Sequence, residues 1–229
     1  MAQVETSESV KFKGGNARFI TRLQVYTDPD SNSRLAYNAR FFLTPDGTDE
    51  QRYIGYLSSW RIRKPTVAHP RARSNWQAEL LKNKPNRLHV NVRETAKCLK
   101  ALFHKDCTVR AEFEKYRNQL QENSLIYIES LFLTAEVRGQ RLMKFAMGGY
   151  DALLGQLPEW LAFTGTLVLV PGKPIKHQES WEGKSDEQIV ADLVVRYEAR
   201  GYIVWAQEVR VEIAAGVSET ICMMGKSLP

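Results

Sequence analysis

Hydrophobic and polar positions alternate along three early segments of the chain, which is the pattern of half-buried strands. These segments are residues 17–27, 34–44 and 52–63, and turn-forming clusters of Asp, Asn, Gly and Pro separate them. We expect three strands here, with the third antiparallel to the second. Residues 1–14 are polar, so we expect a disordered N-terminal tail followed by a single domain over residues 15–229.

The middle of the chain changes from a strand period to a helix period. Over residues 75–123 apolar side chains recur every three to four positions, which predicts a block of helices. Residues 123–134 are apolar on both alternating faces, as in a central strand that is covered on both sides. We expect a helix over residues 136–156 and a further buried strand over residues 161–170.

The last third of the chain opens with a long loop, residues 171–184. Ser185 and Gln188 then have the spacing of a capping box, and Gly201 is a natural C-terminal stop for the helix between them. Two final strands are expected at residues 202–211 and 218–226. This order predicts an α/β fold with one mixed central sheet, flanked by helices, and a helical block between the third and fourth strands.

Composition narrows the class of protein. Apolar residues make up 43% of the chain, which is enough for a core, and there is no apolar run of 18 residues that would span a membrane. The N-terminus has no apolar signal segment, and the three cysteines form no C-x-x-C pair. The four histidines have no ligand spacing, so we expect no metal. We expect a cytoplasmic protein, and a nuclear location stays open.

The positive charge of the chain is concentrated in one region. Residues 52–117 hold 16 Lys and Arg against 5 Asp and Glu, a net charge of +11, whereas the rest of the chain carries −5. Such a field favours an anionic partner, which could be nucleic acid, a phosphorylated cofactor or an acidic protein. An ordinary solvated basic face is the alternative.

Residues 128–143, IESLFLTAEVRGQRLM, combine an apolar strand, a short turn and the start of a helix. The first amides of a helix have no partner within the helix, and together with the helix dipole they form an anion site at the end of the strand. Arg138, Gly139, Gln140 and Arg141 lie at this turn. A pyrophosphate group would fit there on physical grounds.

This stretch resembles the central motif of the GNAT superfamily of acyl-CoA-dependent N-acyltransferases, in which a strand of the sense I-E-x-L-x-V-x-P-E-x-R-G-x-G-x-G leads into a helix. Residues 195–202, VRYEARGY, are similar to a second family segment, L-Y-x-x-x-G-F. The resemblance extends from Asn123 to the C-terminus. Arg141 and Met143 depart from it, because they occupy the two small-residue positions of the family's turn. The family usually places two helices between its first two strands, whereas we expect helices after the third.

The resemblance implies acetyl-CoA as the acyl donor and an amine, either a small molecule or a protein, as the acceptor. In the family, amides of the turn bind the pyrophosphate, and amides of the strand hold the pantetheine arm and polarise the thioester carbonyl. The implied acetyl-CoA-binding residues are Leu131, Phe132, Leu133, Arg138, Gly139, Gln140, Arg141, Leu142 and Met143. Arg141 would add a charged contact where the family has a close backbone approach.

The resemblance also implies two catalytic residues. Glu129 matches a general base that takes a proton from the amine, and Tyr197 matches the general acid that protonates the leaving thiolate. The alternatives are a structural Glu129 paired with an arginine and a core tyrosine at position 197. The presence of both residues favours an N-acetyltransferase. Arg141 and Met143 favour a second hypothesis, a catalytically inactive GNAT-like binding protein that holds an acidic protein or nucleic acid on its basic face, residues 52–117.

Overall fold

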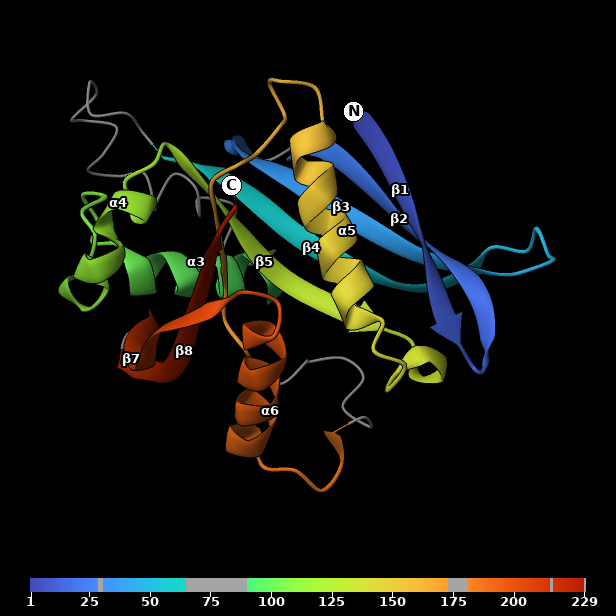
Figure 1. Cartoon of the computed structure of the whole chain (residues 1–229). Coiled ribbons are helices and arrows are strands. Elements are labelled where there is room, and N and C mark those ends of the chain that lie inside the picture. The colour runs from blue at the N-terminus through green and yellow to red at the C-terminus, as the bar shows by residue number, and fades with distance from the viewer. Residues whose placement is uncertain (29–30, 65–89, 173–180, 215, 229) are drawn as a thin grey trace.

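The computed structural model describes residues 1–28, 31–64, 90–172, 181–214 and 216–228. Strands are labelled β, α-helices α and 3-10 helices η. The elements in chain order are β1 (Ala2–Phe12), β2 (Gly15–Asp28), β3 (Ser31–Pro45), β4 (Arg52–Arg63), α3 (Val90–Leu102), η2 (Ala111–Tyr116), α4 (Arg117–Leu120), β5 (Ser124–Leu133), η3 (Ala135–Val137), α5 (Met143–Gln156), β6 (Thr166–Leu169), α6 (Asp186–Glu198), β7 (Ile203–Ala214) and β8 (Val217–Ser227). Figure 1 shows their arrangement.

The strands form one eight-stranded mixed sheet in the order β1-β2-β3-β4-β5-β6-β8-β7. Strands β5 and β6 are parallel, because the chain crosses over through α5 between them. The other neighbouring pairs of described strands are antiparallel. The predicted α/β class with a mixed sheet and flanking helices is therefore confirmed.

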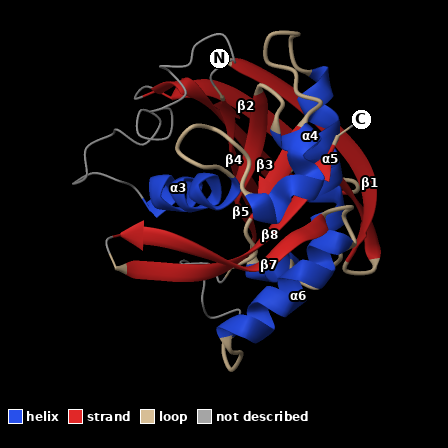
Figure 2. Ribbon diagram, turned by 90° about the vertical axis from the view of Figure 1, so that its left-hand side faces the viewer, coloured by secondary structure: helices blue, strands red, loops and turns tan. Residues whose placement is uncertain are grey.

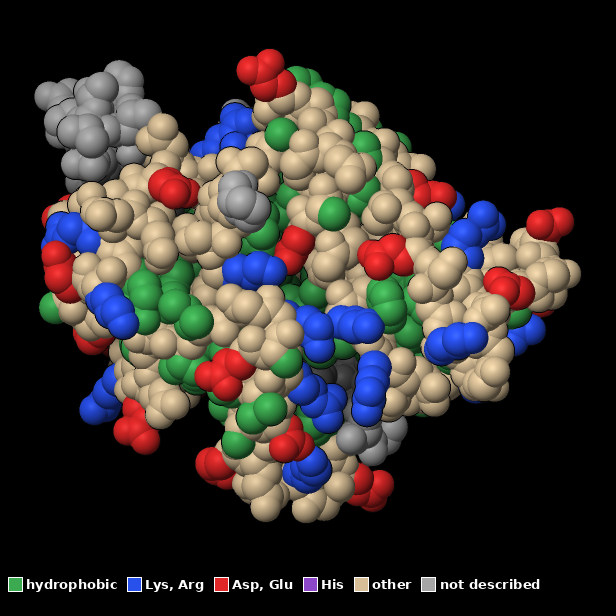
Figure 3. Space-filling view, in the orientation of Figure 1, with side chains coloured by type: hydrophobic (Ala, Val, Ile, Leu, Met, Phe, Trp, Pro, Cys, Tyr) green, Lys and Arg blue, Asp and Glu red, His purple; other side chains and the backbone are tan. Residues whose placement is uncertain are grey.

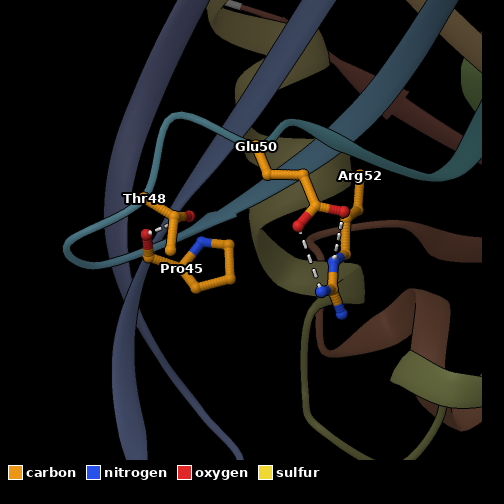
Figure 4. A network of polar contacts seen from close by, with 4 residues as sticks. All are labelled: Pro45, Thr48, Glu50 and Arg52. Carbon is orange, nitrogen blue, oxygen red and sulfur yellow. Dashed lines mark hydrogen bonds and ion pairs between the residues drawn. The ribbon is translucent and has the colours of Figure 1, made fainter.

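The first four strands form an antiparallel meander. The three strands predicted from alternation are β2, β3 and β4, and β4 is antiparallel to β3 as expected. The turn between β3 and β4 is held by the Thr48 amide and hydroxyl, which donate to the Pro45 carbonyl at 3.2 and 3.0 Å. Figure 4 shows this turn together with the exposed ion pair between Arg52 and Glu50.

The expected disordered tail at residues 1–14 is wrong, because residues 2–12 form the edge strand β1. Val10 is buried, and Ala2, Val4 and Phe12 pack against the core, so every second residue faces inward at both ends of the strand. Lys13 and Gly14 close the hairpin to β2 with φ angles of 48° and 81°. Two successive left-handed residues give the tight turn that suits two twisted strands.

The sheet separates two hydrophobic cores. The first core lies against α5 and α6, and the second lies against α3, η2 and α4. Figure 2 shows α3 on one side of the strands and α5 and α6 on the other. In β5, Ile126 and Ile128 belong to the first core and Leu125 and Tyr127 to the second, so the predicted central strand is confirmed there. No helix in the described part of the chain is long and apolar enough to cross a membrane.

The helices follow the predicted order with shifted ends. The helical block lies between β4 and β5 as α3, η2 and α4, while the expected helical pattern from residue 75 to 89 lies outside the described residues. The Ser185–Gln188 capping box is present at the start of α6. The helix expected over residues 136–156 begins only at Met143, because residues 138–142 form a turn. The strand expected over residues 161–170 is limited to β6.

Candidate functional site

Strand β5 continues beyond its parallel neighbour. Its pairing with β6 covers four residue pairs and stops at Ile128 and Leu169, whereas β5 runs on to Leu133. On the other side it stays paired with β4 as far as Gly55. A Cβ atom on Gly55 would lie 2.1 Å from the Phe132 carbonyl oxygen, so this close approach requires glycine. The edge of β5 that faces β6 therefore presents backbone groups that pair with no residue of β6.

A β-bulge places Glu129 at the point where β5 leaves β6. In the register with β4, Ser58 lies opposite Ser130 and Ser59 lies opposite Ile128, so Glu129 is the extra residue. Such an insertion bends the strand and redirects a side chain, and bulges are common beside active sites. Glu129, the carboxylate of this largely apolar strand, therefore lies at the β-bulge itself.

The described contacts of Glu129 are with neutral donors. Its Oε2 atom accepts hydrogen bonds from Ser58 Oγ and Trp60 Nε1, each at 3.1 Å, and no described donor lies on Oε1. Burial raises the pKa of Glu129, while the bonds from Trp60 and Ser58 lower it; Glu94 adds to the rise and Arg34 opposes it. A carboxylate with a raised pKa and one open oxygen has the properties of a general base.

The turn between β5 and α5 has the conformation of an anion-binding nest. Gly139 and Arg141 have left-handed φ angles of 77° and 56°, and Leu142 is right-handed at φ −74° and ψ −15°. In the described part of the chain, no backbone carbonyl accepts from the amides of Gly139, Arg141, Leu142, Met143 and Lys144. A left-handed residue followed by a right-handed one turns successive N–H groups toward one point, which suits an anion.

The two arginines of the turn differ in their contacts. Arg138 Nε donates to the Leu133 carbonyl at 3.0 Å, and its guanidinium lies 5.5 Å from the centre of the Phe132 ring. Arg138 therefore fixes the end of β5. Arg141 and Gln140 are exposed, and the Gln140 amide donates back to the Val137 carbonyl at 3.3 Å. The exposed Arg141 is the arginine whose side chain remains available to a ligand.

Exposed positive side chains lie on the turn, on α5 and on α6. Figure 3 shows Lys and Arg side chains beside the lower end of α5 and toward α6. On the α5 side Arg141 and Lys144 are exposed, and on α6 Arg196 is exposed with its guanidinium 5.5 Å from the centre of the Trp181 ring. A concave group of amides within a positive field attracts phosphate-bearing ligands.

Tyr197 lies in the last turn of α6, partly buried against the first core. Its ring meets that of Tyr202 edge-on, with 5.8 Å between the ring centres. Burial raises the pKa of Tyr197 to about 12, so its phenol keeps its proton at neutral pH and can donate it. No described contact joins Tyr197 to Glu129, and the two side chains pack on different faces of the sheet.

The remaining predicted acetyl-CoA-binding residues lie along β5 and the start of α5. Leu131, Leu133 and Met143 pack their side chains against the first core, and Leu142 is buried within it. Phe132 points to the opposite face, where its ring lies 5.7 Å from that of Tyr56. Their side chains are thus engaged in packing, and a ligand would meet their backbone.

Sequence reasoning missed the residues that hold Glu129. Ser58 and Trp60 alternate on one face of β4, and Asn38 lies opposite Ser58 on β3. Trp60 lies within the basic region, residues 52–117, and nothing in its sequence context predicts a contact with Glu129. The alternation of Ser58 and Trp60 was a visible signal, but their pairing with Glu129 depends on the bulge, which the sequence does not reveal. Among the described residues, no cluster of His, Cys, Asp or Glu could hold a metal ion.

No protein-family model matches the chain. A search of curated proteins also finds no match. The resemblance carried by residues 128–143 and 195–202 therefore stays an expectation, and a functional hypothesis has to rest on the site itself.

Proposed function

We propose that the protein transfers an acetyl group from acetyl-CoA to an amine. The observation that carries the proposal is the nest at the turn, at the end of a strand that continues beyond its pairing with β6. Five amides of the nest have no backbone carbonyl partner in the described part of the chain, those of Gly139, Arg141, Leu142, Met143 and Lys144. A pyrophosphate matches the nest. The arm of a bound acetyl-CoA would then extend along the edge of residues 129–133, which lies beyond the pairing with β6 and would present its backbone to the thioester carbonyl.

The proposed chemistry needs two proton transfers, and the two candidate residues fit them. The amine nitrogen forms a bond to the acetyl carbon while the carbon–sulfur bond breaks. Glu129 accepts the proton that leaves the nitrogen, and the raised pKa of its carboxyl group favours this role near neutral pH. Tyr197 supplies a proton to the leaving thiolate.

The placement of Glu129 and Tyr197 on different faces of the sheet suggests where the amine and the thiolate would lie. Glu129 bonds to Trp60, which packs against the second core, whereas Tyr197 packs against the first core. We infer that the amine approaches from the Glu129 face and that the thiolate lies toward α6. Strand β6 follows α5 and pairs in parallel with β5.

The inactive binding protein is the second candidate, and a specific observation favours it. Arg138 is engaged with the end of β5, and Arg141 stands at a left-handed position where the family has glycine. Much of the basic face invoked by this hypothesis, residues 65–89, lies outside the described residues. Direct binding of acetyl-CoA separates the two hypotheses.

Titration calorimetry with acetyl-CoA tests the proposal on wild type, Arg141→Glu and Lys13→Glu. Lys13 is a matched control, because it is also an exposed cation with a left-handed φ, of 48°, in the β1–β2 hairpin. We expect one molecule bound per chain. Arg141→Glu should weaken binding by at least about tenfold, since a lost charged hydrogen bond costs about 1.5–3 kcal/mol, and Lys13→Glu should bind as wild type.

Thermal unfolding gives an independent measurement. A ligand at 100 times its dissociation constant stabilises the folded state by about 2.7 kcal/mol, so acetyl-CoA should raise Tm clearly. Neither heat nor a Tm change at millimolar acetyl-CoA would refute the proposal and leave the inactive binding protein. If binding is found, release of free CoA thiol across a panel of amines would identify the acceptor.

A further inference from the structure

Ser58 lies between two hydrogen-bond acceptors. Its Oγ atom is 3.1 Å from Glu129 Oε2 on one side and 3.3 Å from Asn38 Oδ1 on the other. A serine hydroxyl has one proton and can donate it to only one of them at a time. The position of this proton is therefore coupled to the charge on Glu129.

The orientation of Asn38 is fixed by its other side. Asn38 Nδ2 donates a hydrogen bond to the Tyr26 hydroxyl, which turns Oδ1 toward Ser58. Asn38 also lies directly opposite Ser58 in the register of β3 and β4. The polar row thus crosses four adjacent strands, from Tyr26 on β2 to Glu129 on β5.

We propose that Ser58 is a positioning residue that hydrogen-bonds Glu129 in both protonation states, with Asn38 as its alternative acceptor. When Glu129 is ionised, the Ser58 hydroxyl donates to its carboxylate. When Glu129 has taken a proton, its O–H group donates to Ser58 Oγ, and the Ser58 hydroxyl turns to Asn38 Oδ1. The purpose of this switch rests on the proposed role of Glu129 as a base.

The two neighbours of the switch should shift the Glu129 equilibrium in opposite directions. Ser58 gives the carboxylate a charge-assisted bond, which is stronger than a bond between neutral groups, so its loss favours protonation. Asn38 Oδ1 is needed only when Glu129 is protonated. Without Asn38 the Ser58 proton has no second acceptor, and the ionised form of Glu129 is favoured.

Other charged and polar groups face Glu129 and have to stay in place. Arg34 acts from β3, Glu94 from α3 and Tyr127 from β5. Glu94 is paired with Lys97 at 2.9 Å, which tempers its charge. Trp60 is a donor only and holds Glu129 Oε2 in either state. None of these groups is altered by a substitution at Ser58 or Asn38.

The experiment is a carboxyl ¹³C NMR titration of the full chain with labelled glutamate and without acetyl-CoA. The Glu129 signal is the one missing in Glu129→Gln. Ser58→Ala should raise the protonation constant by about tenfold, as expected for a lost bond to a charged group, while Ser58→Thr, which keeps the hydroxyl, should titrate as wild type. Asn38→Leu should lower the constant, although an apolar side chain of similar size would otherwise raise it by desolvation.

Tyr26→Phe is a milder test of the role of Asn38 in the switch. Tyr26 is 37% exposed, so the loss of its hydroxyl should leave the fold intact. With the Asn38 amide released, the constant should fall less than in Asn38→Leu. A constant that rises or stays unchanged in Asn38→Leu and Tyr26→Phe, or that does not rise in Ser58→Ala, would overturn the switch. These titrations need no acyl donor, so their failure is distinct from a failure to bind acetyl-CoA.

Discussion

The two halves of β5 have different surroundings although they belong to one strand. Residues 125–128 are at most 3% exposed, pair with strands on both sides and separate the two cores. Residues 129–133 are partly buried and lie beyond the pairing with β6, and they begin at a bulge in the register with β4. The first half has nothing left to offer a ligand. The second half has an edge that pairs with no residue of β6 and carries the Glu129 carboxylate, and these are the two features on which the proposed site depends.

The largest expected effects concern turnover, once an acceptor amine is known. Tyr197→Phe should slow acetyl transfer by about 10²–10⁴-fold, because general acid catalysis contributes that much, and should leave acetyl-CoA binding nearly unchanged. Tyr150→Phe is the matched control. It also removes a buried phenol hydroxyl, one that bonds to Ser59 at 2.6 Å, and it should affect stability rather than turnover.

Glu129→Gln should slow turnover over the same range but with a different pH dependence. The variant lacks the base, so its defect should shrink as pH rises and more of the amine is already deprotonated. A pH–rate profile of wild type and both variants measures this difference. Equal rates for wild type and both variants across the pH range would mean that neither Glu129 nor Tyr197 takes part in the proposed chemistry.

The next effect is on stability and compares the two halves directly. Ile126→Ala should lower the free energy of unfolding by about 2–5 kcal/mol, as expected for a large cavity in a core. Leu131→Ala removes a partly buried side chain and should cost less than half as much. Urea denaturation of the two variants gives both values. Equal losses would show that the second half is packed as tightly as the first.

The contrast between the buried and the partly buried half of β5 also explains how much of the fold the sequence predicts. A strand with apolar residues at regular positions along its whole length has a pattern that the sequence shows, as for β2, β3, β4 and residues 125–128. Strand β1 was missed because its centre is polar on both faces and only Ala2, Val4, Val10 and Phe12 mark its inner side. An edge strand of this kind gains its order from pairing with β2, which composition does not show.

The candidate site was predictable in part. The sequence shows Glu129 and the succession of strand, turn and helix. It predicts that the helix starts at residue 136, whereas residues 138–142 form a turn in the structure. The bulge, the end of β6 pairing at Leu169 and the contacts of Ser58 all depend on register. Register is set by three-dimensional pairing over many residues, so one sequence could not reveal it.

A smaller effect concerns the pH dependence of stability. The pKa of Glu129 is raised above its ordinary value of 4.5, so the folded chain binds this proton more tightly than the unfolded chain. Its stabilising contribution is present at low pH and is lost as pH rises from about 4.5 through the folded pKa. Glu129→Gln should therefore gain stability relative to wild type at neutral pH and show no gain at pH values near 4.

Glu112 provides the control of opposite sign. A hydrogen bond from Arg110 lowers the pKa of Glu112, so its contribution is present above the ordinary carboxyl range and is lost on acidification. Glu112→Gln should lose stability relative to wild type at neutral pH and converge with it at low pH. Tm measured across the pH range tests both variants. Parallel curves for Glu129→Gln and wild type would contradict the raised pKa.

The smallest effect separates backbone strain from ligand binding at the turn. Arg141 has a φ of 56°, a left-handed conformation that costs a residue with a side chain about 1–2 kcal/mol. Glycine relieves this strain but makes the unfolded chain more flexible, which takes back about 0.4–1 kcal/mol. Arg141→Gly should therefore stabilise the protein by roughly 1 kcal/mol or less. Lys13→Gly, with its φ of 48° in the β1–β2 hairpin, should give a similar gain.

The two glycine variants should have similar stability and should differ in their affinity for acetyl-CoA. If the Arg141 side chain binds the pyrophosphate, Arg141→Gly weakens acetyl-CoA binding although it stabilises the free protein, and Lys13→Gly does not change the affinity. Urea denaturation and calorimetry on the same samples measure both quantities. Unchanged or tighter binding by Arg141→Gly would mean that the nest acts through its backbone amides alone. Arg141 would then occupy a strained backbone position without a role of its own toward phosphate.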